Sequence, residues 1–243
     1  MTTLERFQDA LTDSTTDLDR PELLPERLAR AVAEVLPVDG AGISLFFTPQ
    51  RRLPLGASDE QSAVAERLQF TVGEGPCLTA HEQGRPIVAD EATIRSSWPA
   101  FHDSLVTRTS IRGVISLPLG DELRGVGALD LYLVPPRPID SVTLVDALAV
   151  ARAVVSVFQQ GNVRASPEGD GPAWLDAPAA GRRSLVWQAM GFVNVGLQVT
   201  SSDALALLRA HAYGAGLDLD ELAGLVLERE VPLELLALDA PSR

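Results

Sequence analysis

The single cysteine, Cys77, and the histidine four residues after it, His81, come nearest to a reactive pair in this chain. On a helix this spacing puts both side chains on one face, where they could supply two ligands to a metal ion. Two ligands do not complete a site, and neither His102 nor His211 is at ligand spacing. We therefore predict no metal site, and a haem ligand from His81 or His102 stays open as the alternative. A lone cysteine in a glycine-rich turn is typically small and buried, so we interpret Cys77 as a core residue rather than a redox sensor.

The other candidates for catalysis have structural explanations. Asp90 and Glu91 are adjacent, so their carboxylates point apart, and helix capping or exposure to solvent explains them. Gly125-Val126-Gly127 lies within a predicted hairpin rather than before a helix, unlike a dinucleotide-binding turn. All 20 basic residues are arginine, which excludes reactions that need a lysine. We predict no catalytic residue, no cofactor and no enzymatic activity.

The net charge of -13 limits the binding partners. An acidic chain repels a phosphate backbone at long range, so nucleic-acid binding would need a local group of arginines. No apolar run reaches the ~18 residues of a membrane-spanning helix. Residues 1–6 also lack the charged and apolar regions of a signal peptide. We expect a cytoplasmic protein that does not bind membranes.

Hydrophobic periodicity and the positions of glycine and proline predict an α+β fold with a small all-α domain at the C-terminal end. Helices are expected at 4–18, 21–35, 59–69 (capped by Ser58), 76–83, 140–160 (capped by Asp140), 184–198, 203–213 and from 218. Strands are expected at 38–47, 52–57, 86–89, 113–119 and 125–133. We predict an N-terminal helix in 1–19, a sensor domain at 20–160, a linker at 161–181 and a helical domain at 182–236.

The helix at 140–160 is long enough to leave the sensor domain as a lever or to pair two chains as a dimer seam. The residues expected on its apolar face are Val142, Val145, Leu148, Ala149, Arg152 and Val155.

The segment 20–160 resembles a GAF domain. The resemblance rests on Gly73-Glu74-Gly75-Pro76-Cys77, Gly84-Arg85-Pro86-Ile87, Asp90, Trp98-Pro99, Phe101, Arg112 to Leu119 and Gly125 to Tyr132. It implies an antiparallel sheet flanked by helices, with a small-molecule pocket under the cover formed by residues 75–110. The residues expected to line that pocket are Val72, Cys77, Leu78, Ile87, Phe101 and Val114.

The segment 184–230 is similar to an ANTAR domain, the three-helix RNA-binding output of bacterial antitermination regulators. The matching residues are Ala189 and Gly191 on the first helix, Ala204, Leu208, Arg209 and Ala212 on the second, and Leu219, Leu222 and Ala223 on the third. Met190 departs from the pattern, because the family usually has a lysine there. The balance over 182–230 is 4 arginines against 6 carboxylates, so the basic surface is thin.

We expect a sensor-output regulator whose first domain responds to a small molecule or a partner protein. The helix at 140–160 would transmit the signal, and the C-terminal helices would bind an RNA hairpin and prevent transcription termination. Arg182, Arg183 and Arg209 are the expected RNA contacts, and a homodimer is expected because the helical domain is small. The alternative is a degenerate ANTAR-like domain that serves protein contact or dimerisation without RNA binding.

Overall fold

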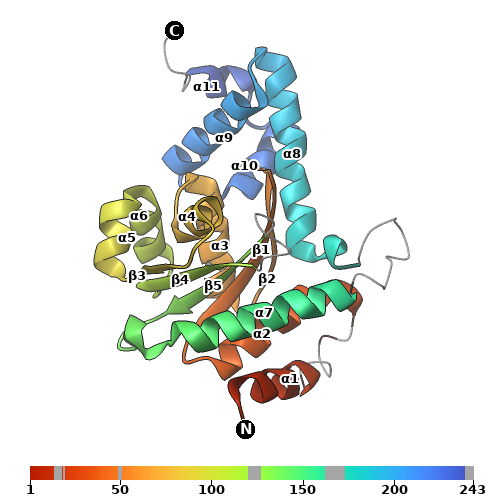
Figure 1. The fold of residues 1–243 in the computed structure, drawn as a ribbon. Coiled ribbons are helices and arrows are strands. Elements are labelled where there is room, and N and C mark those ends of the chain that lie inside the picture. The colour runs from red at the N-terminus through yellow and green to blue at the C-terminus, as the bar shows by residue number, and fades with distance from the viewer. Residues whose placement is uncertain (14–17, 19, 49–50, 120–126, 162–172, 239–243) are drawn as a thin grey trace.

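The computed structural model describes residues 1–13, 18, 20–48, 51–119, 127–161 and 173–238. A five-stranded sheet with helices on both faces is followed by a group of C-terminal helices (Figure 1). The strands lie in the order β2-β1-β5-β4-β3, and each neighbouring pair is antiparallel. Their bounds are β1 Gly40–Thr48, β2 Arg51–Ala57, β3 Ile87–Ala89, β4 Gly113–Pro118 and β5 Gly127–Leu133. The predicted antiparallel sheet with flanking helices is thus confirmed.

The described residues form eleven α-helices, seven within residues 3–161, which also contain the sheet, and four after residue 177. The first group is α1 Thr3–Asp13, α2 Leu24–Val35, α3 Glu60–Val72, α4 Pro76–Gln83, α5 Glu91–Ser97, α6 Pro99–Arg108 and α7 Leu144–Gly161. The second group, which we call the C-terminal unit, is α8 Pro178–Leu197, α9 Ser201–Ala215, α10 Leu219–Leu227 and α11 Leu233–Leu238.

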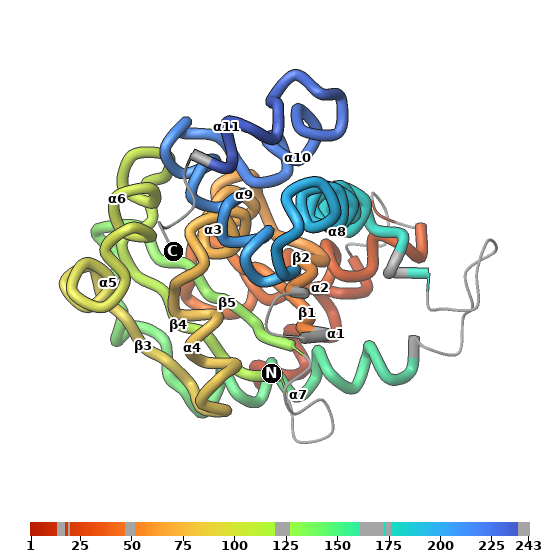
Figure 2. The backbone as a smooth tube through the Cα atoms, turned by 90° about the horizontal axis from the view of Figure 1, so that it is seen from above, coloured from red at the N-terminus to blue at the C-terminus, as the bar shows by residue number. Residues whose placement is uncertain are grey.

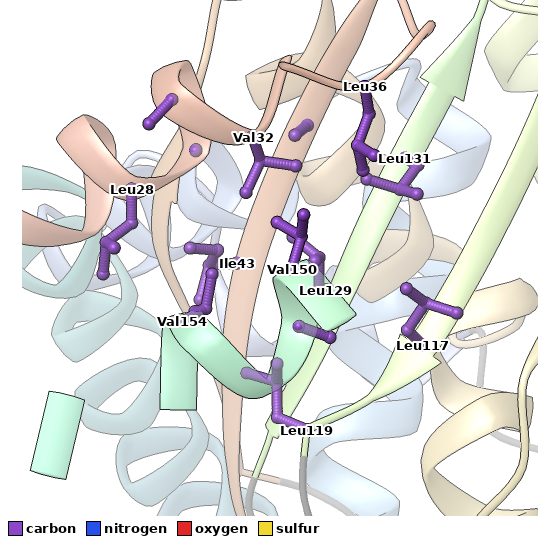
Figure 3. Close-up of a cluster of buried hydrophobic side chains, with 14 of the residues drawn as sticks. Leu28, Val32, Leu36, Ile43, Leu117, Leu119, Leu129, Leu131, Val150 and Val154 are labelled. Atoms are coloured by element: carbon purple, nitrogen blue, oxygen red, sulfur yellow. The ribbon is translucent and has the colours of Figure 1, made fainter. Parts of the chain in front are cut away.

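The sheet has one apolar face, covered by α2 and α7, and α1 packs on these two helices. Successive side chains of a strand point to opposite faces, so the alternate residues of β1, β4 and β5 gather on that side. Figure 3 shows this core, in which α2 contributes Leu28 and Val32 and α7 contributes Val150 and Val154. The strand residues in the same cluster include Ile43, Leu45, Ile115, Leu117, Leu129 and Leu131.

The other face of the sheet is covered by α3 and α4, and the C-terminal unit packs on the far side of α3 and, through α8, on β2 (Figures 1 and 2). Helix α3 contacts β1 and β2 below it and α9 and α10 above it. It begins at an N-cap, Asp59, whose carboxylate accepts a hydrogen bond of 3.0 Å from the Ser62 amide. Its last residue is followed by Gly73 in the left-handed conformation, with φ of 77°, which ends the helix.

Several predicted element boundaries are wrong. Asp59 rather than Ser58 caps α3, because the Ser58 hydroxyl instead accepts from the Ala41 amide. Helix α7 begins at Leu144 rather than after Asp140, since residues Ile139–Ser141 form a separate short helical turn. Helix α8 begins at Pro178, inside the predicted linker. Residues 14–17, 125–126 and 162–172, on which parts of the predicted N-terminal helix, glycine turn and linker fall, lie outside the described residues.

The predicted role of α7 as a lever is also wrong in this structure. The helix lies along the sheet, with Ala147, Val150, Val154 and Phe158 buried in the core. The predicted face was rotated: Val145 is 77% exposed, whereas Ala147 is fully buried. The sequence pattern allowed this error because α7 is apolar on most of its surface.

None of the helices in the described residues combines the length and the hydropathy that a membrane-spanning segment needs.

Candidate functional site

The face of the sheet under α3 carries a cluster of buried polar side chains. The strands contribute Ser44 from β1, Arg52 from β2, and Asp130 and Tyr132 from β5, and α3 contributes Glu66 and Gln69. All of these residues are at most 2% exposed. The alternation of the strands explains the placement, because each polar strand residue is next in sequence to a core leucine or isoleucine on the opposite face. We call these six residues the buried network.

Glu66 is the centre of the buried network. The Tyr132 hydroxyl donates to one carboxylate oxygen of Glu66 at 2.6 Å, and the Ser44 hydroxyl donates to the other at 2.6 Å. Arg52 donates from Nη1 to the Glu66 backbone carbonyl at 2.6 Å and from Nη2 to the carboxylate. Hydrogen bonds from three strands to one residue fix the position of α3 on the sheet.

Gln69 connects the buried network to the Gly73-Glu74-Gly75-Pro76-Cys77 turn. Its side-chain nitrogen donates to Asp130 Oδ2 at 3.0 Å, and its side-chain oxygen accepts from the Cys77 amide at 2.8 Å. Gly75 has a φ of 146°, and a Cβ there would lie 2.6 Å from the Gln69 oxygen. Glycine is therefore required at this point of the motif both by the backbone and by the close approach of Gln69.

The buried network holds one guanidinium and two carboxyl groups, and the pKa values of the two carboxyls diverge. Burial and the adjacent Glu66 carboxylate raise the pKa of Asp130 well above its usual value. Burial also raises the pKa of Glu66, but the Arg52 charge and the hydrogen bonds that Glu66 accepts outweigh burial, so its pKa is lowered overall. These opposite shifts favour the ionised form of Glu66, the closer partner of Arg52, and the protonated form of Asp130.

The opposite side of α3 faces the C-terminal unit, and its central residue is Phe70. The Arg183 guanidinium of α8 lies 3.8 Å from the centre of the Phe70 ring, and that of Arg209 from α9 lies 4.8 Å from it. Arg209 Nε also donates to the Phe70 carbonyl at 2.9 Å. Trp187 meets the ring edge-on at 5.8 Å. Phe70 belongs to the hydrophobic cluster of the C-terminal unit, so a sensor-domain side chain completes that core.

A second group of contacts surrounds Asp218, the N-cap of α10. Its carboxylate accepts from Arg67 Nε of α3 at 3.0 Å and from Arg108 Nη2 of α6 at 3.1 Å. The Leu219 amide donates to Thr71 Oγ1 at 3.1 Å. Glu221 completes the predicted capping box, since its side chain accepts from the Asp218 amide at 2.9 Å. These bonds tie the start of α10 to both α3 and α6.

The predicted RNA contacts do not share one exposed surface. Arg182 is exposed, whereas Arg183 is 1% exposed and Arg209 is half-buried against α3. The sequence placed both arginines on the correct helices, but it does not show that α3 covers them. In this conformation Arg183 cannot reach a phosphate group.

The predicted ligand-pocket residues fall into two places. Ile87, Phe101 and Val114 are buried in one cluster under α5 and α6, against which Val72 packs. Cys77 is buried with Phe46 and Ala128, and Leu78 packs against them. Burial raises the pKa of the Cys77 thiol well above its usual value, so the side chain is an unreactive thiol. Except for Val72, which also lines a cavity described below, these residues fill the core here, and that they line a ligand pocket stays a prediction.

His81 makes no metal pair with Cys77. Its ring stacks on Phe46 with the two ring centres 3.8 Å apart. The described residues contain no group of three or more histidine, cysteine, aspartate or glutamate side chains that could hold a metal ion. Asp90 caps α5 by accepting from the Thr93 amide at 2.8 Å, which confirms the capping interpretation.

Two cavities adjoin the boundary between the sensor domain and the C-terminal unit. One, of about 490 Å³, is lined by Val72, Thr71 and Arg108 together with Tyr213 and Leu217. The other, of about 320 Å³, lies between β2, α3 and α8 and is lined by Arg67, Arg182 and Asp220, among others. Ligand sites often form at such boundaries.

Sequence reasoning missed the buried network and Phe70. For Asp130 the sequence did contain a signal, because it is the one charged residue in the strand Gly127–Leu133. A charged residue in an apolar strand must be either exposed to solvent or paired with a polar partner. No comparable signal marked Glu66 or Gln69, since polar residues are ordinary on a helix with one covered face. Phe70 could not be assigned to the C-terminal unit from its position in the chain.

A family model described as "GAF domain" matches residues 20–158. None of the curated proteins matches the chain. Among solved structures, similarity extends to the GAF domain of a phosphoenolpyruvate-protein phosphotransferase from Coxiella burnetii, at 13% identity, TM-score 0.46, and 66% and 95% coverage of this chain and that chain. For the GAF domain of the Acinetobacter phosphoenolpyruvate-protein phosphotransferase, the identity is 12% and the TM-score 0.45. That match covers 67% of this chain and 98% of the Acinetobacter chain. For free methionine-R-sulfoxide reductase from Neisseria meningitidis, the identity is 15% and the TM-score 0.43. That match covers 65% of this chain and 92% of the reductase chain.

Proposed function

This chain belongs to the GAF domain family through residues 20–158, and we propose that it is a regulator whose GAF domain controls the C-terminal unit. The effector is a small molecule or a partner protein that binds the GAF domain. Binding changes how the GAF domain holds the C-terminal unit, which is the output. A ligand changes such an equilibrium only by its difference in affinity for the two states, typically 1–3 kcal/mol.

We propose RNA as the target of the output. Residues 184–230 are similar to an ANTAR domain through Leu208, Arg209 and Ala212, and that similarity supports binding to an RNA hairpin and antitermination of transcription. Arg182, Arg183 and Arg209 would contact phosphates. The chain would act as a cytoplasmic homodimer and catalyse no reaction.

The observation that carries the regulatory proposal is the double role of α3. One side of this helix supplies Glu66 and Gln69 to the buried network, and the other supplies Phe70 and Thr71 to the contacts with the C-terminal unit. A shift of α3 in response to an effector would therefore change both sets of contacts together. Coupling through one rigid helix needs no flexible connection between the two domains.

A gel-shift assay with hairpin RNA tests the proposed output. At low salt we expect a retarded species whose affinity falls as salt is added, because each phosphate contact releases counterions. Native mass spectrometry of freshly purified protein would identify the bound effector and the number of chains. No retarded species at any protein concentration, with a dimer confirmed by mass and the effector bound, would remove RNA binding from the proposal.

A second candidate function is protein contact without RNA binding. It is favoured by the positions of Arg183 and Arg209, which face Phe70 rather than solvent, and by the 6 carboxylates that outnumber the 4 arginines in 182–230. Under this alternative the arginines serve docking alone. Substituting Arg182, which is exposed, distinguishes the two: Arg182→Gln weakens RNA binding only if RNA is the target.

A further inference from the structure

The arginines that an RNA-binding output would use are part of the contact that holds the C-terminal unit closed. Arg183 is 1% exposed, and its guanidinium covers the Phe70 ring. Arg209 bonds to the carbonyl of the same residue. Gly73 leaves room for this approach, since a Cβ there would lie 3.0 Å from Arg209 Nη1. In the docked form both guanidinium groups therefore contact Phe70 directly, so neither is free to bind a phosphate group.

The docked position leaves the hydrogen-bond donors of Arg183 unsatisfied, which offsets the attraction between its charge and the Phe70 ring. None of its three guanidinium nitrogens has a hydrogen-bond partner, although Asp220 Oδ1 lies 3.3 Å from Nη1 as an ion pair. Burial outweighs the opposing effect of the Asp220 carboxylate and, together with the nearby positive charges of Arg52 and Arg209, lowers the pKa of Arg183 to about 9. A buried cation with unsatisfied donors opposes the association that buries it. Undocking would return these donors to water or to another acceptor.

Other contacts favour the docked position. Asp218 is bound by Arg67 and Arg108, and Thr71 accepts from the Leu219 amide. Phe70 is fully buried within the core of the C-terminal unit. The closed form is thus held by the Asp218 contacts, by ring burial and by the packing of α8 on β2, with Ala180 in the core of the sheet. It is opposed by the desolvation of Arg183. Opposing contributions of this kind give two states that a modest signal can shift.

We propose that the structure is the autoinhibited form of this regulator, in which α3 withholds Arg183 and Arg209 from RNA. Release of the C-terminal unit from α3 exposes both guanidinium groups to phosphate oxygens. RNA itself then favours the open form, because its phosphates replace the acceptors that Arg183 lacks when docked. The inference depends on the proposed RNA-binding function, and it adds the means by which the GAF domain suppresses that function.

The double variant Thr71→Val/Arg108→Ala tests the inference in the full-length chain. It removes two contacts to the C-terminal unit, while Arg183, Arg209 and Phe70 are unchanged. The matched control is Arg137→Ala, which breaks an ion pair to Asp39 at 3.0 Å within the GAF domain. Arg137 is 38% exposed, close to the 33% of Arg108. Spin labels at Glu82→Cys and Ser202→Cys, both exposed, report the distance between α4 and α9, since the buried Cys77 does not label.

In the double variant we expect a longer and broader label distance and a fall in the RNA dissociation constant of about tenfold, because apparent affinity rises with the open fraction. Arg137→Ala should match the wild type in both measurements. Adding Arg183→Gln to the double variant should remove most of the gain in affinity.

Each contrary result has a separate meaning. An opened double variant with unchanged RNA affinity would overturn autoinhibition and leave the RNA-binding function standing. An opened variant that binds no RNA, when the wild type also binds none, would overturn the RNA-binding function, and autoinhibition with it. An unchanged label distance would show that these contacts do not hold the docking, which also overturns the inference.

Discussion

The pKa values of the two carboxyl groups in the buried network shift in opposite directions, and this difference has a measurable consequence. Glu66→Gln removes the ionised partner of the fully buried Arg52, and we expect a loss of about 3 kcal/mol in the free energy of unfolding. The raised pKa of Asp130 favours its protonated form, so Asp130→Asn should cost only about 1 kcal/mol. Urea unfolding of both variants at neutral pH measures the contrast. Equal losses would mean that the two carboxyl groups share the charge.

The glycine-rich turn offers a second test with an internal control. Gly75 has a φ of 146° and no room for a Cβ beside Gln69, whereas Gly84 has a φ of 62° and open space, with no atom within 4 Å of the point that a Cβ would occupy. We expect Gly75→Ala to destabilise the protein by about 3 kcal/mol, since strain and displacement of Gln69 add, and Gly84→Ala by about 1 kcal/mol. Thermal unfolding compares the two. Equal effects would indicate that Gln69 moves aside at little cost.

The helix α10 carries the third test, at the scale of one element. Burial raises the pKa of Asp218, but hydrogen bonds and charge from Arg108 and Arg67 outweigh burial and leave the pKa below its ordinary value. A lowered pKa means that ionised Asp218 stabilises the folded state above the ordinary aspartate pKa of about 4, and that this contribution is lost as pH falls through the lowered value. Acid should therefore weaken the attachment of α10.

Asp218→Asn isolates this contribution, because asparagine preserves the N-cap of α10 but carries no charge. We expect the wild type to be more stable than the variant above about pH 5, and the difference to shrink below about pH 4. Unfolding free energies measured at several pH values from about 6 to about 3 provide the comparison. A constant difference across that whole range would assign the stabilisation to hydrogen bonding rather than to charge.

The sequence predicted elements better than it predicted their surroundings. Strands β1, β4 and β5 were found because glycine and proline interrupt apolar runs, and the capping box at Asp218 marked α10 directly. The face of α7 was wrong because its apolar residues extend most of the way round the helix. The short helix α11 was missed, since its six residues after Pro232 carry little periodicity.

The residues of the candidate site were less accessible to sequence reasoning for a physical reason. As arginines, Arg183 and Arg209 have side chains suited to binding phosphate groups. Only the packing of α3 against α8 and α9 shows that another part of the same chain covers them. Contacts between residues far apart in the chain, such as Arg108 with Asp218, follow from docking rather than from local pattern. Burial of a polar residue by a distant segment leaves no periodic signal.

At the scale of the whole molecule, the shared core around Phe70 determines how far the two domains act together. Phe70 is fully buried in the cluster of the C-terminal unit, whereas Phe101 is equally buried in a cluster of the GAF domain alone. Truncating either ring to alanine typically costs about 3–5 kcal/mol. The two variants therefore impose similar losses at sites that differ in whether the C-terminal unit depends on them.

Hydrogen exchange resolved by peptide distinguishes the two effects. We expect Phe70→Ala to speed exchange in α9 and α10, because it removes a ring from their core, and Phe101→Ala to speed exchange in α5 and α6 while α9 and α10 stay protected. Faster exchange in all four helices under either substitution would show that the chain opens as one cooperative body. A C-terminal unit that can detach while the GAF domain stays folded is what release of Arg183 and Arg209 requires, so this pattern of protection bears directly on whether the docked form can act as a switch.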